Sequence, residues 1–432
     1  MSKEQFQIDD TDGPVLTRAW VLHPDLKSDH FRRNADLSLA EAVSLAHALS
    51  ELDVIGSDTV RLPKPNAGML FGSGKVKELH DAFEEAEIDL VLIDGKVTPV
   101  QQRNLEKAWG VKVLDRTALI LEIFSERAAT REGVLQVEMA ALTYQRTRLV
   151  RAWTHLERQR GGLGFVGGPG ETQIESDRRA IDDQLVRLRR QLDKVVKTRA
   201  LHRAARKKVP YPIVALVGYT NAGKSTLFNY LTGANVMAED MLFATLDPTM
   251  RRWNMEDGPE VILSDTVGFI SDLPTELVAS FRATLEEVLA ADIICHVRDI
   301  SHPESEAQAK DVRDIMKVLG VDTERPTFEI WNKLDALDDD AAEAVKVRAD
   351  RDDMVYVTSA TKGIGTDALM EGIAEALQGA LMTEDLTLSF AKGRERAWLF
   401  SNDVVLEENQ TDEGFVVTVR WSGRQKAQFK AL

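Results

Sequence analysis

Cysteine is almost absent from this sequence, in which Cys295 is the single one among 432 residues. One cysteine excludes a disulfide framework and a four-cysteine zinc site. Long apolar runs are absent too: none approaches the length of a membrane span, and Met1–Phe6 lack the hydrophobic core of a signal peptide. We therefore expect a soluble protein without a membrane span, in which Cys295 is a buried, small apolar side chain.

Positive charge is scarce overall but concentrated in one segment. The chain has 54 Lys and Arg against 70 Asp and Glu, a net charge of −16. Residues 146–208 hold 17 Lys and Arg against 7 Asp and Glu, so this segment carries +10 and the remainder −26. An acidic protein with one basic segment is expected to use that segment on a polyanion.

The first 130 residues alternate between strand and helix patterns. Ser38, with Glu41 three residues later, reads as the capping box of a helix. Such alternation predicts a small α/β domain with a largely parallel sheet. Strands are expected at 19–22, 89–93 and 111–114, and helices at 38–46 and 100–109.

Residues 131–208 have the pattern of two amphipathic helices, because apolar residues recur at three-, four- and seven-residue steps. A glycine-rich stretch at 161–170 separates them, so we expect an antiparallel helical hairpin with this stretch at its tip. Two interpretations of the tip remain open. It is either a solvated linker or, given the arginines on both sides, a loop whose backbone approaches RNA closely.

The segment Gly218–Ser225 follows the apolar run Ile213–Val217 and leads into a helix pattern. Its spacing is G-x-x-x-x-G-K-S, in which backbone N–H groups and a helix N-terminus surround a phosphate chain. Lys224 is expected on the β- and γ-phosphates, and the hydroxyl of Ser225 on Mg²⁺.

Two further segments supply the parts that sense a γ-phosphate. Asp265 follows a strand and is expected to hold Mg²⁺ through a water, while the N–H of Gly268 meets the γ-phosphate. Between them, a threonine can place its hydroxyl on Mg²⁺ in the triphosphate state. We choose Thr245 over Thr249 for this role.

The base is predicted to be guanine. Asn332-Lys333-Leu334-Asp335 ends a strand with N-K-x-D, and the Asp335 carboxylate can accept from guanine N1–H and N2–H₂, which adenine does not offer. A second strand is followed by Ser359-Ala360, where a backbone N–H can meet guanine O6. These motifs in this order predict binding of GTP and GDP with Mg²⁺.

Two positions bear on the rate of hydrolysis. Phe269 occupies the place where many GTPases have a water-orienting glutamine, so we predict slow hydrolysis that a partner accelerates. Asn221 is expected either to help hold K⁺ against the phosphates or to brace the loop by a hydrogen bond.

The sequence thus predicts an α/β fold with four parts: an α/β domain at 1–130, a basic hairpin at 131–208, a P-loop GTPase domain at 209–380 and an α+β appendage at 381–432. Lys224, Thr245 and Gly268 are the predicted catalytic residues, and Ser225 and Thr245 the predicted metal ligands. The predicted nucleotide contacts are Gly218, Tyr219, Thr220, Asn221, Ala222, Gly223, Lys224, Ser225, Phe243, Ala244, Thr245, Leu246, Asp247, Asp265, Thr266, Val267, Gly268, Asn332, Lys333, Leu334, Asp335, Ser359, Ala360 and Thr361.

Four of these segments resemble the HflX family, within the Obg–HflX GTPases: Gly161–Gly164, Gly168–Arg179, Gly218–Ser225 and Phe243–Thr249. The resemblance is strong over the hairpin and the nucleotide domain. Val166 departs from members with arginine in the tip, and Arg298 stands where an apolar residue is usual.

The resemblance implies binding to the large ribosomal subunit, with RNA contacts through the 146–208 hairpin, and GTP-linked dissociation of stalled or idle ribosomes. It also implies a cytoplasmic, ribosome-associated monomer, with peripheral membrane association left open. Two alternatives remain: a GTPase that assists large-subunit assembly, and a non-ribosomal switch protein whose hairpin is a protein-binding coiled coil.

Overall fold

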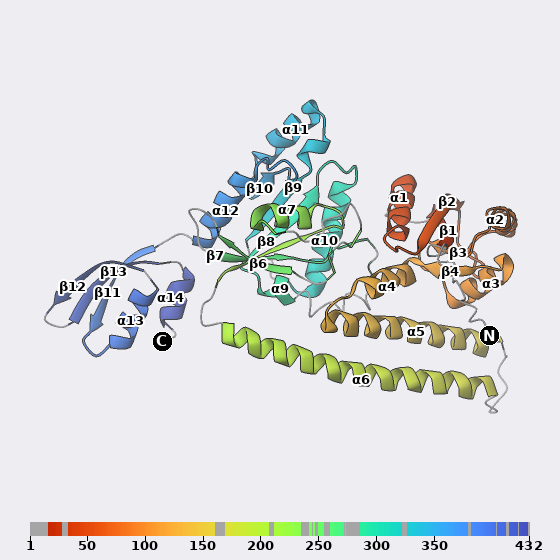
Figure 1. Ribbon diagram of the computed structural model, residues 1–432, viewed down its shortest axis with the longest axis horizontal. Helices are drawn as coiled ribbons and strands as arrows, with labels where there is room; N and C mark the ends of the chain where they lie inside the picture. The colour runs from red at the N-terminus through yellow and green to blue at the C-terminus, as the bar shows by residue number, and fades with distance from the viewer. Residues whose placement is uncertain are drawn as a thin grey trace, which may run out of the picture.

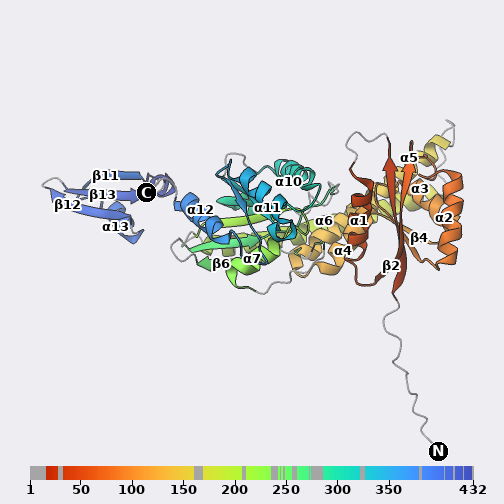
Figure 2. The same ribbon diagram turned by 90° about the horizontal axis from the view of Figure 1, so that it is seen from above.

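The computed structural model describes residues 16–27, 33–159, 169–206, 211–234, 242–243, 245–246, 249–254, 260–271, 273, 286–321, 326–378, 382–402, 404–411, 414–421 and 423–430. The described chain forms an elongated molecule with a six-stranded sheet in the middle (Figure 1). The N-terminal sheet lies at one end and a small C-terminal sheet at the other, as the view from above also shows (Figure 2). None of the helices in these ranges is both long and apolar enough to cross a membrane.

The N-terminal part is a four-stranded parallel sheet of order β2-β1-β3-β4 with helices on both faces. Helices α2 and α3 pack on one face, and α1 and α4 pack on the other, which faces the central sheet. The elements are β1 (Thr17–Leu26), α1 (Ala35–Ala46), β2 (Leu52–Leu62), α2 (Ser73–Glu85), β3 (Leu90–Ile93), α3 (Pro99–Trp109), β4 (Lys112–Asp115) and α4 (Arg116–Arg127).

The expected capping box at Ser38 is wrong. Helix α1 begins one turn earlier, at Ala35, and Asn34 is its N-cap. The amide oxygen of Asn34 accepts from the N–H groups of Asp36 and Leu37 at 2.9 and 3.4 Å. Because Asn34 already satisfies these free N–H groups, Ser38 lies inside the helix and Glu41 is released for other contacts.

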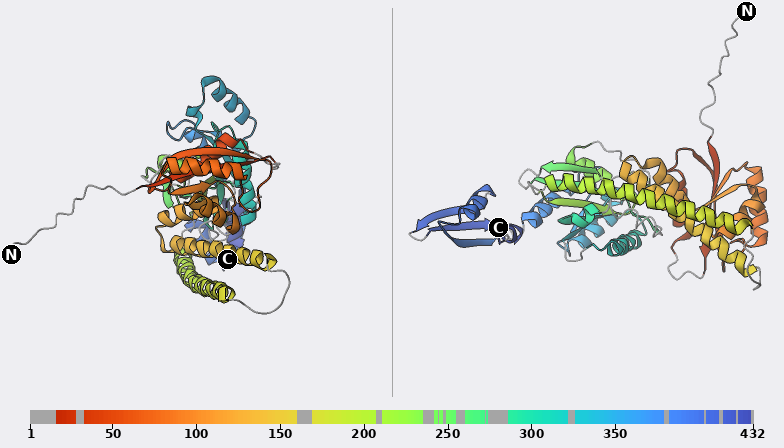
Figure 3. Two further views of the ribbon diagram at one scale, coloured as in Figure 1. Left: turned by 90° about the vertical axis from the view of Figure 1, so that its right-hand side faces the viewer. Right: turned by 90° about the horizontal axis from the view of Figure 1, so that it is seen from below.

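The hairpin consists of two long helices, α5 (Arg131–Gln159) and α6 (Pro169–Arg206). They run side by side beneath the other domains (Figure 3). Leu185 and Leu188 of α6 are buried, and Gln184 donates to Glu138 across the pair at 3.1 Å. The predicted glycine-rich tip falls on residues 160–168, outside the described residues.

The central domain is a six-stranded sheet of order β10-β9-β8-β5-β7-β6, parallel except for the β6–β7 pair. Helices α7 and α12 cover one face, and α9 and α10 cover the other. Its elements are β5 (Ile213–Gly218), α7 (Lys224–Thr232), β6 (Thr249–Asn254), β7 (Glu260–Asp265), α9 (Glu286–Ala290), β8 (Ile293–Asp299), α10 (Ser305–Leu319), β9 (Thr327–Asn332), a 3₁₀ turn η1 (Leu334–Ala336), α11 (Asp339–Ala349), β10 (Val355–Val357) and α12 (Thr366–Gln378).

The two unusual side chains of strand β8 are both buried. Cys295 is fully buried, as predicted, and burial raises the pKa of its thiol. Arg298 is 4% exposed and forms ion pairs with Glu329 at 2.6 Å and Glu306 at 2.8 Å. These two carboxylates explain how a cation is accommodated at a position where the family resemblance leads one to expect an apolar side chain.

The C-terminal part is an antiparallel sheet of order β11-β13-β12 with two helices. Trp421, at the end of β13, is 1% exposed and packs on Phe429 of the last helix with ring centroids 5.2 Å apart. The elements are β11 (Met382–Ser389), α13 (Gly393–Ser401), β12 (Val405–Thr411), β13 (Gly414–Trp421) and α14 (Gly423–Lys430).

One apolar cluster joins the N-terminal and central domains. It runs from Leu45 of α1 and Phe124 of α4 to Phe243, Phe269 and Val312 of the central domain. The nucleotide loops are therefore built against the N-terminal domain rather than standing free on the central sheet.

Candidate nucleotide-binding site

The loop Gly218–Ser225 connects the end of β5 to the start of α7, as its spacing predicts. Gly223 is the N-cap of α7 with φ +89, and a Cβ there would lie 2.2 Å from Nδ2 of Asn332. Asn332 in turn donates to the carbonyl oxygen of Ala222 at 3.0 Å. The loop and the end of β9 therefore approach so closely that only glycine fits at position 223.

Lys224 is buried beneath the loop. Its ammonium donates to the carbonyl oxygen of Tyr219 at 2.8 Å. Burial lowers the pKa of Lys224 to about 8, and the nearby Asp265 opposes that change. A Cβ on Gly268 would lie 3.1 Å from this ammonium and 2.9 Å from Cα of Thr220, so residue 268 is also in close contact with the loop.

Three oxygen-bearing side chains from separate elements meet beside Lys224. Ser225 Oγ lies 2.8 Å from Thr245 Oγ1, and both hydroxyls donate to Asp265 Oδ2, at 2.7 and 2.9 Å. Asp265 is fully buried, and its second oxygen, Oδ1, accepts no hydrogen bond from the described residues. Burial raises the pKa of Asp265 although Lys224, Ser225 and Thr245 act to lower it. A buried carboxylate with a free oxygen next to two hydroxyls is a donor set that fits Mg²⁺.

Thr245 and Thr249 lie in different environments. Thr249 begins β6 and is paired in register with Asp265, so it is part of the sheet. Between them, Leu246 is buried in the apolar cluster that joins the two domains, and Asp247 lies outside the described residues, as does Ala244 before Thr245. Of the two threonines, Thr245 is the one whose hydroxyl reaches Ser225 and Asp265.

Phe243 directs its ring into the protein. The ring stacks edge-on against Phe124 of α4 with centroids 4.6 Å apart, and it is 2% exposed. Its carbonyl oxygen accepts from Arg127 of α4 at 2.9 Å. Phe243 thus fastens the segment that carries Thr245 to the N-terminal domain.

The segment after Asp265 is held close to the loop. Thr266 donates to the carbonyl oxygen of Leu216 at 2.6 Å, and Val267 is buried in the shared cluster. Backbone hydrogen bonds join Phe269 N–H to Gly218 O at 3.0 Å and Thr220 N–H to Phe269 O at 2.7 Å. The ring of Phe269 is 2% exposed, so the position after Gly268 offers no polar side chain.

The residues predicted to read the base meet at the ends of β9 and β10. Asp335 is exposed, and its carboxylate accepts from Ser359 Oγ at 2.6 Å and Thr361 Oγ1 at 3.2 Å, which lowers its pKa. Asn332 Oδ1 accepts from the N–H of Ala360 at 3.0 Å. The structure thus brings Ser359 and Thr361 onto the carboxylate of Asp335, and it joins their neighbour Ala360 to Asn332.

The neighbours of Asp335 complete this end of the site. Lys333 adopts φ +65, and its ammonium pairs with Asp299 at 2.9 Å, a partner that the sequence did not suggest. Leu334 is buried, and its N–H donates to the carbonyl oxygen of Thr358 at 3.1 Å. The side chain of Lys333 is therefore held at its tip by Asp299, two positions along the chain from the exposed carboxylate of Asp335.

Asn221 lies on the exposed side of the loop with φ +58, a conformation that asparagine adopts more readily than most residues. It lines a pocket of about 210 Å³ between the loop, α1 of the N-terminal domain and the β8–α10 connection. The pocket also includes Ser38, Glu41 and His302. The N-terminal domain therefore forms one wall beside the phosphate loop.

The phosphate loop follows β5, the buried Asp265 ends β7, and the N-K-x-D carboxylate follows β9, all at the carboxyl ends of parallel strands. Together with the two hydroxyls beside Asp265, these features define a P-loop GTPase. Family profiles match nearly the whole chain. They are described as GTP-binding GTPase N-terminal (residues 36–125), GTP-binding GTPase Middle Region (127–206), 50S ribosome-binding GTPase (213–333) and HflX C-terminal domain (344–431).

Similar proteins cover most of the chain. The GTPase HflX of Magnetococcus marinus is 46% identical over 402 residues, which are 93% of this chain and 90% of that protein. The GTPase HflX of Escherichia coli is 40% identical over 381 residues, 88% of each chain. That of Caldanaerobacter subterraneus is 41% identical over 413 residues, 93% of this chain and 94% of the relative. The chain belongs to the HflX family of GTPases, and it binds and hydrolyses GTP.

Proposed function

We propose that this GTPase binds the large ribosomal subunit and couples GTP binding and hydrolysis to the dissociation of stalled or idle ribosomes. The observation that carries the proposal is the long hairpin, whose helix α6 presents the exposed arginines Arg187, Arg189 and Arg190. A helix pair with exposed arginines suits an RNA surface, because arginine binds phosphate through two parallel hydrogen bonds. The profile match described as 50S ribosome-binding GTPase supports the same partner.

In the proposed site, the Gly218–Ser225 backbone surrounds the phosphates, and Lys224 contributes its charge to the β- and γ-phosphates. Ser225 and Thr245 would hold Mg²⁺ directly, and Asp265 through a water. Mg²⁺, when bound, neutralises charge on the β- and γ-phosphate oxygens. The N–H of Gly268 meets the γ-phosphate, and Asp335 selects guanine.

Hydrolysis is proposed to be slow until the ribosome completes the site. The buried Phe269 cannot orient the attacking water, and groups supplied by partners accelerate such GTPases by roughly 10³–10⁵. The protein would then act as a cytoplasmic monomer. GTP orders the loop at Thr245, and the hairpin then binds RNA. Hydrolysis releases the loop from the nucleotide and the hairpin from the RNA.

Co-sedimentation with purified large subunits across a salt series tests the hairpin's role. Replacing Arg187 and Arg190 with alanine should weaken binding and reduce the slope of log affinity against log salt by about one per lost phosphate contact. The matched control replaces Lys346 and Arg351, two exposed cations of the GTPase domain, and should leave the slope unchanged. Equal slopes for wild type and the arginine variant would argue for the protein-binding coiled coil instead.

A further inference from the structure

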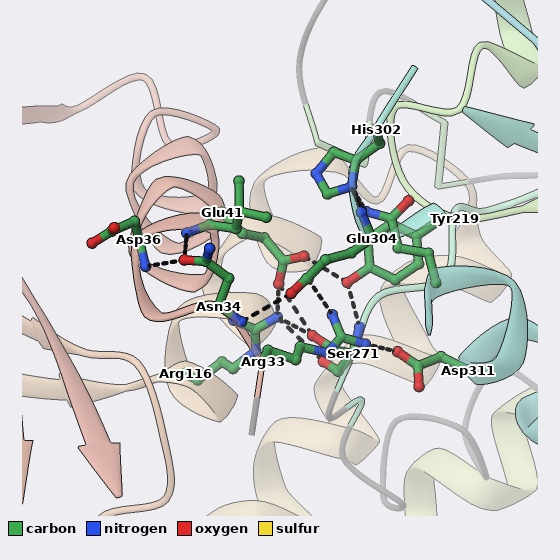
Figure 4. Close-up of polar contacts among 12 residues, drawn as sticks. Arg33, Asn34, Asp36, Glu41, Arg116, Tyr219, Ser271, His302, Glu304 and Asp311 are labelled. Carbon is green, nitrogen blue, oxygen red and sulfur yellow. Dashed lines mark hydrogen bonds and ion pairs between the residues drawn. The ribbon is translucent and has the colours of Figure 1, made fainter. Parts of the chain in front are cut away.

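A carboxylate of the N-terminal domain contacts two separate segments of the nucleotide site (Figure 4). Glu41, on α1, accepts from the hydroxyl of Tyr219 at 2.6 Å and from Oγ of Ser271 at 3.1 Å. Tyr219 belongs to the phosphate loop, and Ser271 lies three residues after Gly268. The N–H of Ser271 donates to the hydroxyl of Tyr219 at 2.9 Å, so the three residues form a closed triangle of hydrogen bonds.

Arg116, the first residue of α4, also helps to hold Glu41 in this position. Its guanidinium pairs with Glu41 and donates to Oγ and the carbonyl oxygen of Ser271 at 3.1 and 3.2 Å. The other guanidinium nitrogen pairs with Asp94 at 2.6 Å, and Asp94 contacts His23 at 2.7 Å. Although burial alone would lower the pKa of Arg116, Asp94 and Glu41 raise it above its usual range, so the guanidinium stays charged.

The hydroxyl of Tyr219 has one fixed role in this arrangement. Tyr219 is 4% exposed, and burial together with Glu41 raises the pKa of its hydroxyl. The hydroxyl is therefore protonated at neutral pH, and it donates to Glu41 while it accepts from Ser271. If the side chain turned away, its buried hydroxyl would lose both Glu41 and Ser271 as partners, which is unfavourable.

The same tyrosine is directly connected to the groups that would meet a γ-phosphate. Its carbonyl oxygen accepts from the ammonium of Lys224 at 2.8 Å. Its neighbours Gly218 and Thr220 are hydrogen-bonded to the backbone of Phe269, next to Gly268. A displacement of Tyr219 relative to Ser271 would therefore change the spacing between Lys224 and the N–H of Gly268.

We propose that Glu41 is a positioning residue for GTP hydrolysis, which fixes the phosphate loop relative to the segment after Gly268 through Tyr219 and Ser271. The proposal rests on the assignment of Gly218–Ser225 as the phosphate loop, but not on ribosome binding. The apolar cluster that includes Phe124 and Phe243 already holds the N-terminal and central domains together. A buried ion pair adds little net stability by itself, so the main consequence of the bridge is the geometry of the site.

The test measures single-turnover GTP hydrolysis by the full-length protein without ribosomes. Glu41→Ala should lower the hydrolysis rate about tenfold, as expected for losing a hydrogen bond to a charged group, while the affinity for GDP changes less than about twofold. Glu41→Gln should restore part of the rate, because its single amide oxygen can replace either the oxygen that accepts from Tyr219 or the one that accepts from Ser271, but not both. The control Glu126→Ala removes a different carboxylate of this domain, an exposed one that contacts Ser50, and should match wild type.

A double-mutant cycle of Glu41→Ala and Tyr219→Phe distinguishes loss of positioning from a general disruption of the structure. Tyr219→Phe removes only the hydroxyl and leaves the ring in the apolar cluster. If Glu41 acts through Tyr219, the double variant should be no slower than Glu41→Ala alone. A wild-type rate for a folded Glu41→Ala protein, or fully additive losses in the cycle, would overturn the proposal. Failure of the wild-type protein to bind ribosomes would contradict the proposed function and leave this result intact.

Discussion

Removing the carboxylate of Asp335 should abolish the preference of this protein for guanine. Asp335 is exposed at the mouth of the site, and in this structure its two oxygens accept from Ser359 and Thr361. Bound guanine would add two N–H donors to this carboxylate, whereas adenine offers none at the same places. Asp335→Ala therefore removes two charge-assisted hydrogen bonds that only guanine can make.

The expected magnitude follows from those two bonds. A hydrogen bond to a charged group contributes about 1.5–3 kcal/mol, and the exposure of Asp335 favours the lower value. Two bonds at about 1.5 kcal/mol each amount to about 3 kcal/mol, or a loss of roughly 100- to 200-fold in GDP affinity. Affinity for ADP, which is weak from the start, should remain as it is.

Titration with fluorescent GDP and ADP measures both affinities. Asp339→Ala is the matched control, since Asp339 is an exposed carboxylate four residues further on, in the first turn of α11. It should bind GDP like wild type. If Asp335→Ala kept its GDP affinity within a few fold, the base would be read elsewhere and the assignment of the N-K-x-D motif would be refuted.

Other parts of the site give separate predictions. Thr245→Ala should weaken binding of a non-hydrolysable GTP analogue with Mg²⁺ about tenfold or more while GDP affinity stays within about twofold, because the hydroxyl serves the triphosphate state. Thr249→Ala should leave both affinities unchanged. If equilibrium titrations show the loss for Thr249→Ala and not for Thr245→Ala, our choice of threonine is reversed. Since the pKa of Lys224 is lowered to about 8, GDP affinity should fall as pH rises from 7 to 9, by up to about tenfold per unit above 8, and titrations of Lys224→Met should lose this dependence. In the nucleotide-free protein the folded pKa lies below the unfolded value of about 10.4, so the contribution of Lys224 to folding stability should increase with pH between about 8 and 10 in denaturant titrations. If Asn221 helps to hold K⁺, hydrolysis should be faster in KCl than in NaCl and Asn221→Ala should remove the difference; identical rates would leave the loop-bracing interpretation.

The nucleotide site could be predicted from the sequence because its motifs are local. Gly218–Ser225 and Asn332–Asp335 are continuous stretches whose spacing alone determines which backbone and side-chain groups converge. Thr245 and Thr249 both lie between the phosphate loop and Asp265, so the order of the segments leaves both as candidates and the choice of Thr245 goes beyond it. The structure places the chosen threonine beside Ser225, and its role as a ligand stays a prediction.

The contacts between domains could not be predicted in the same way. Glu41 was interpreted as part of a capping box with Ser38, although Asn34 was an equally good cap four residues earlier. Nothing in the spacing connects Glu41 with Tyr219, which is 178 residues away. Such pairs depend on how two finished domains pack, and only the structure reveals them.

Phe243 and helix α14 also depend on tertiary contacts that the local sequence does not reveal. Phe243 was predicted as a nucleotide contact from its place near Thr245, yet its ring packs on Phe124 of the N-terminal domain. Helix α14 has a mostly polar sequence, whose pattern does not predict a helix. Packing of Phe429 on Trp421 and Trp398 shows that a tertiary contact stabilises it.

Light scattering of purified 70S ribosomes tests the proposed function most directly. The protein is added with GTP, with a non-hydrolysable GTP analogue or with GDP, and dissociation into subunits is followed as a fall in scattering. The proposed mechanism predicts a fall with GTP and with the analogue, little change with GDP, and a weaker effect when Arg187 and Arg190 are replaced by alanine. Unchanged scattering in every nucleotide, or an equal fall with GDP, would contradict it.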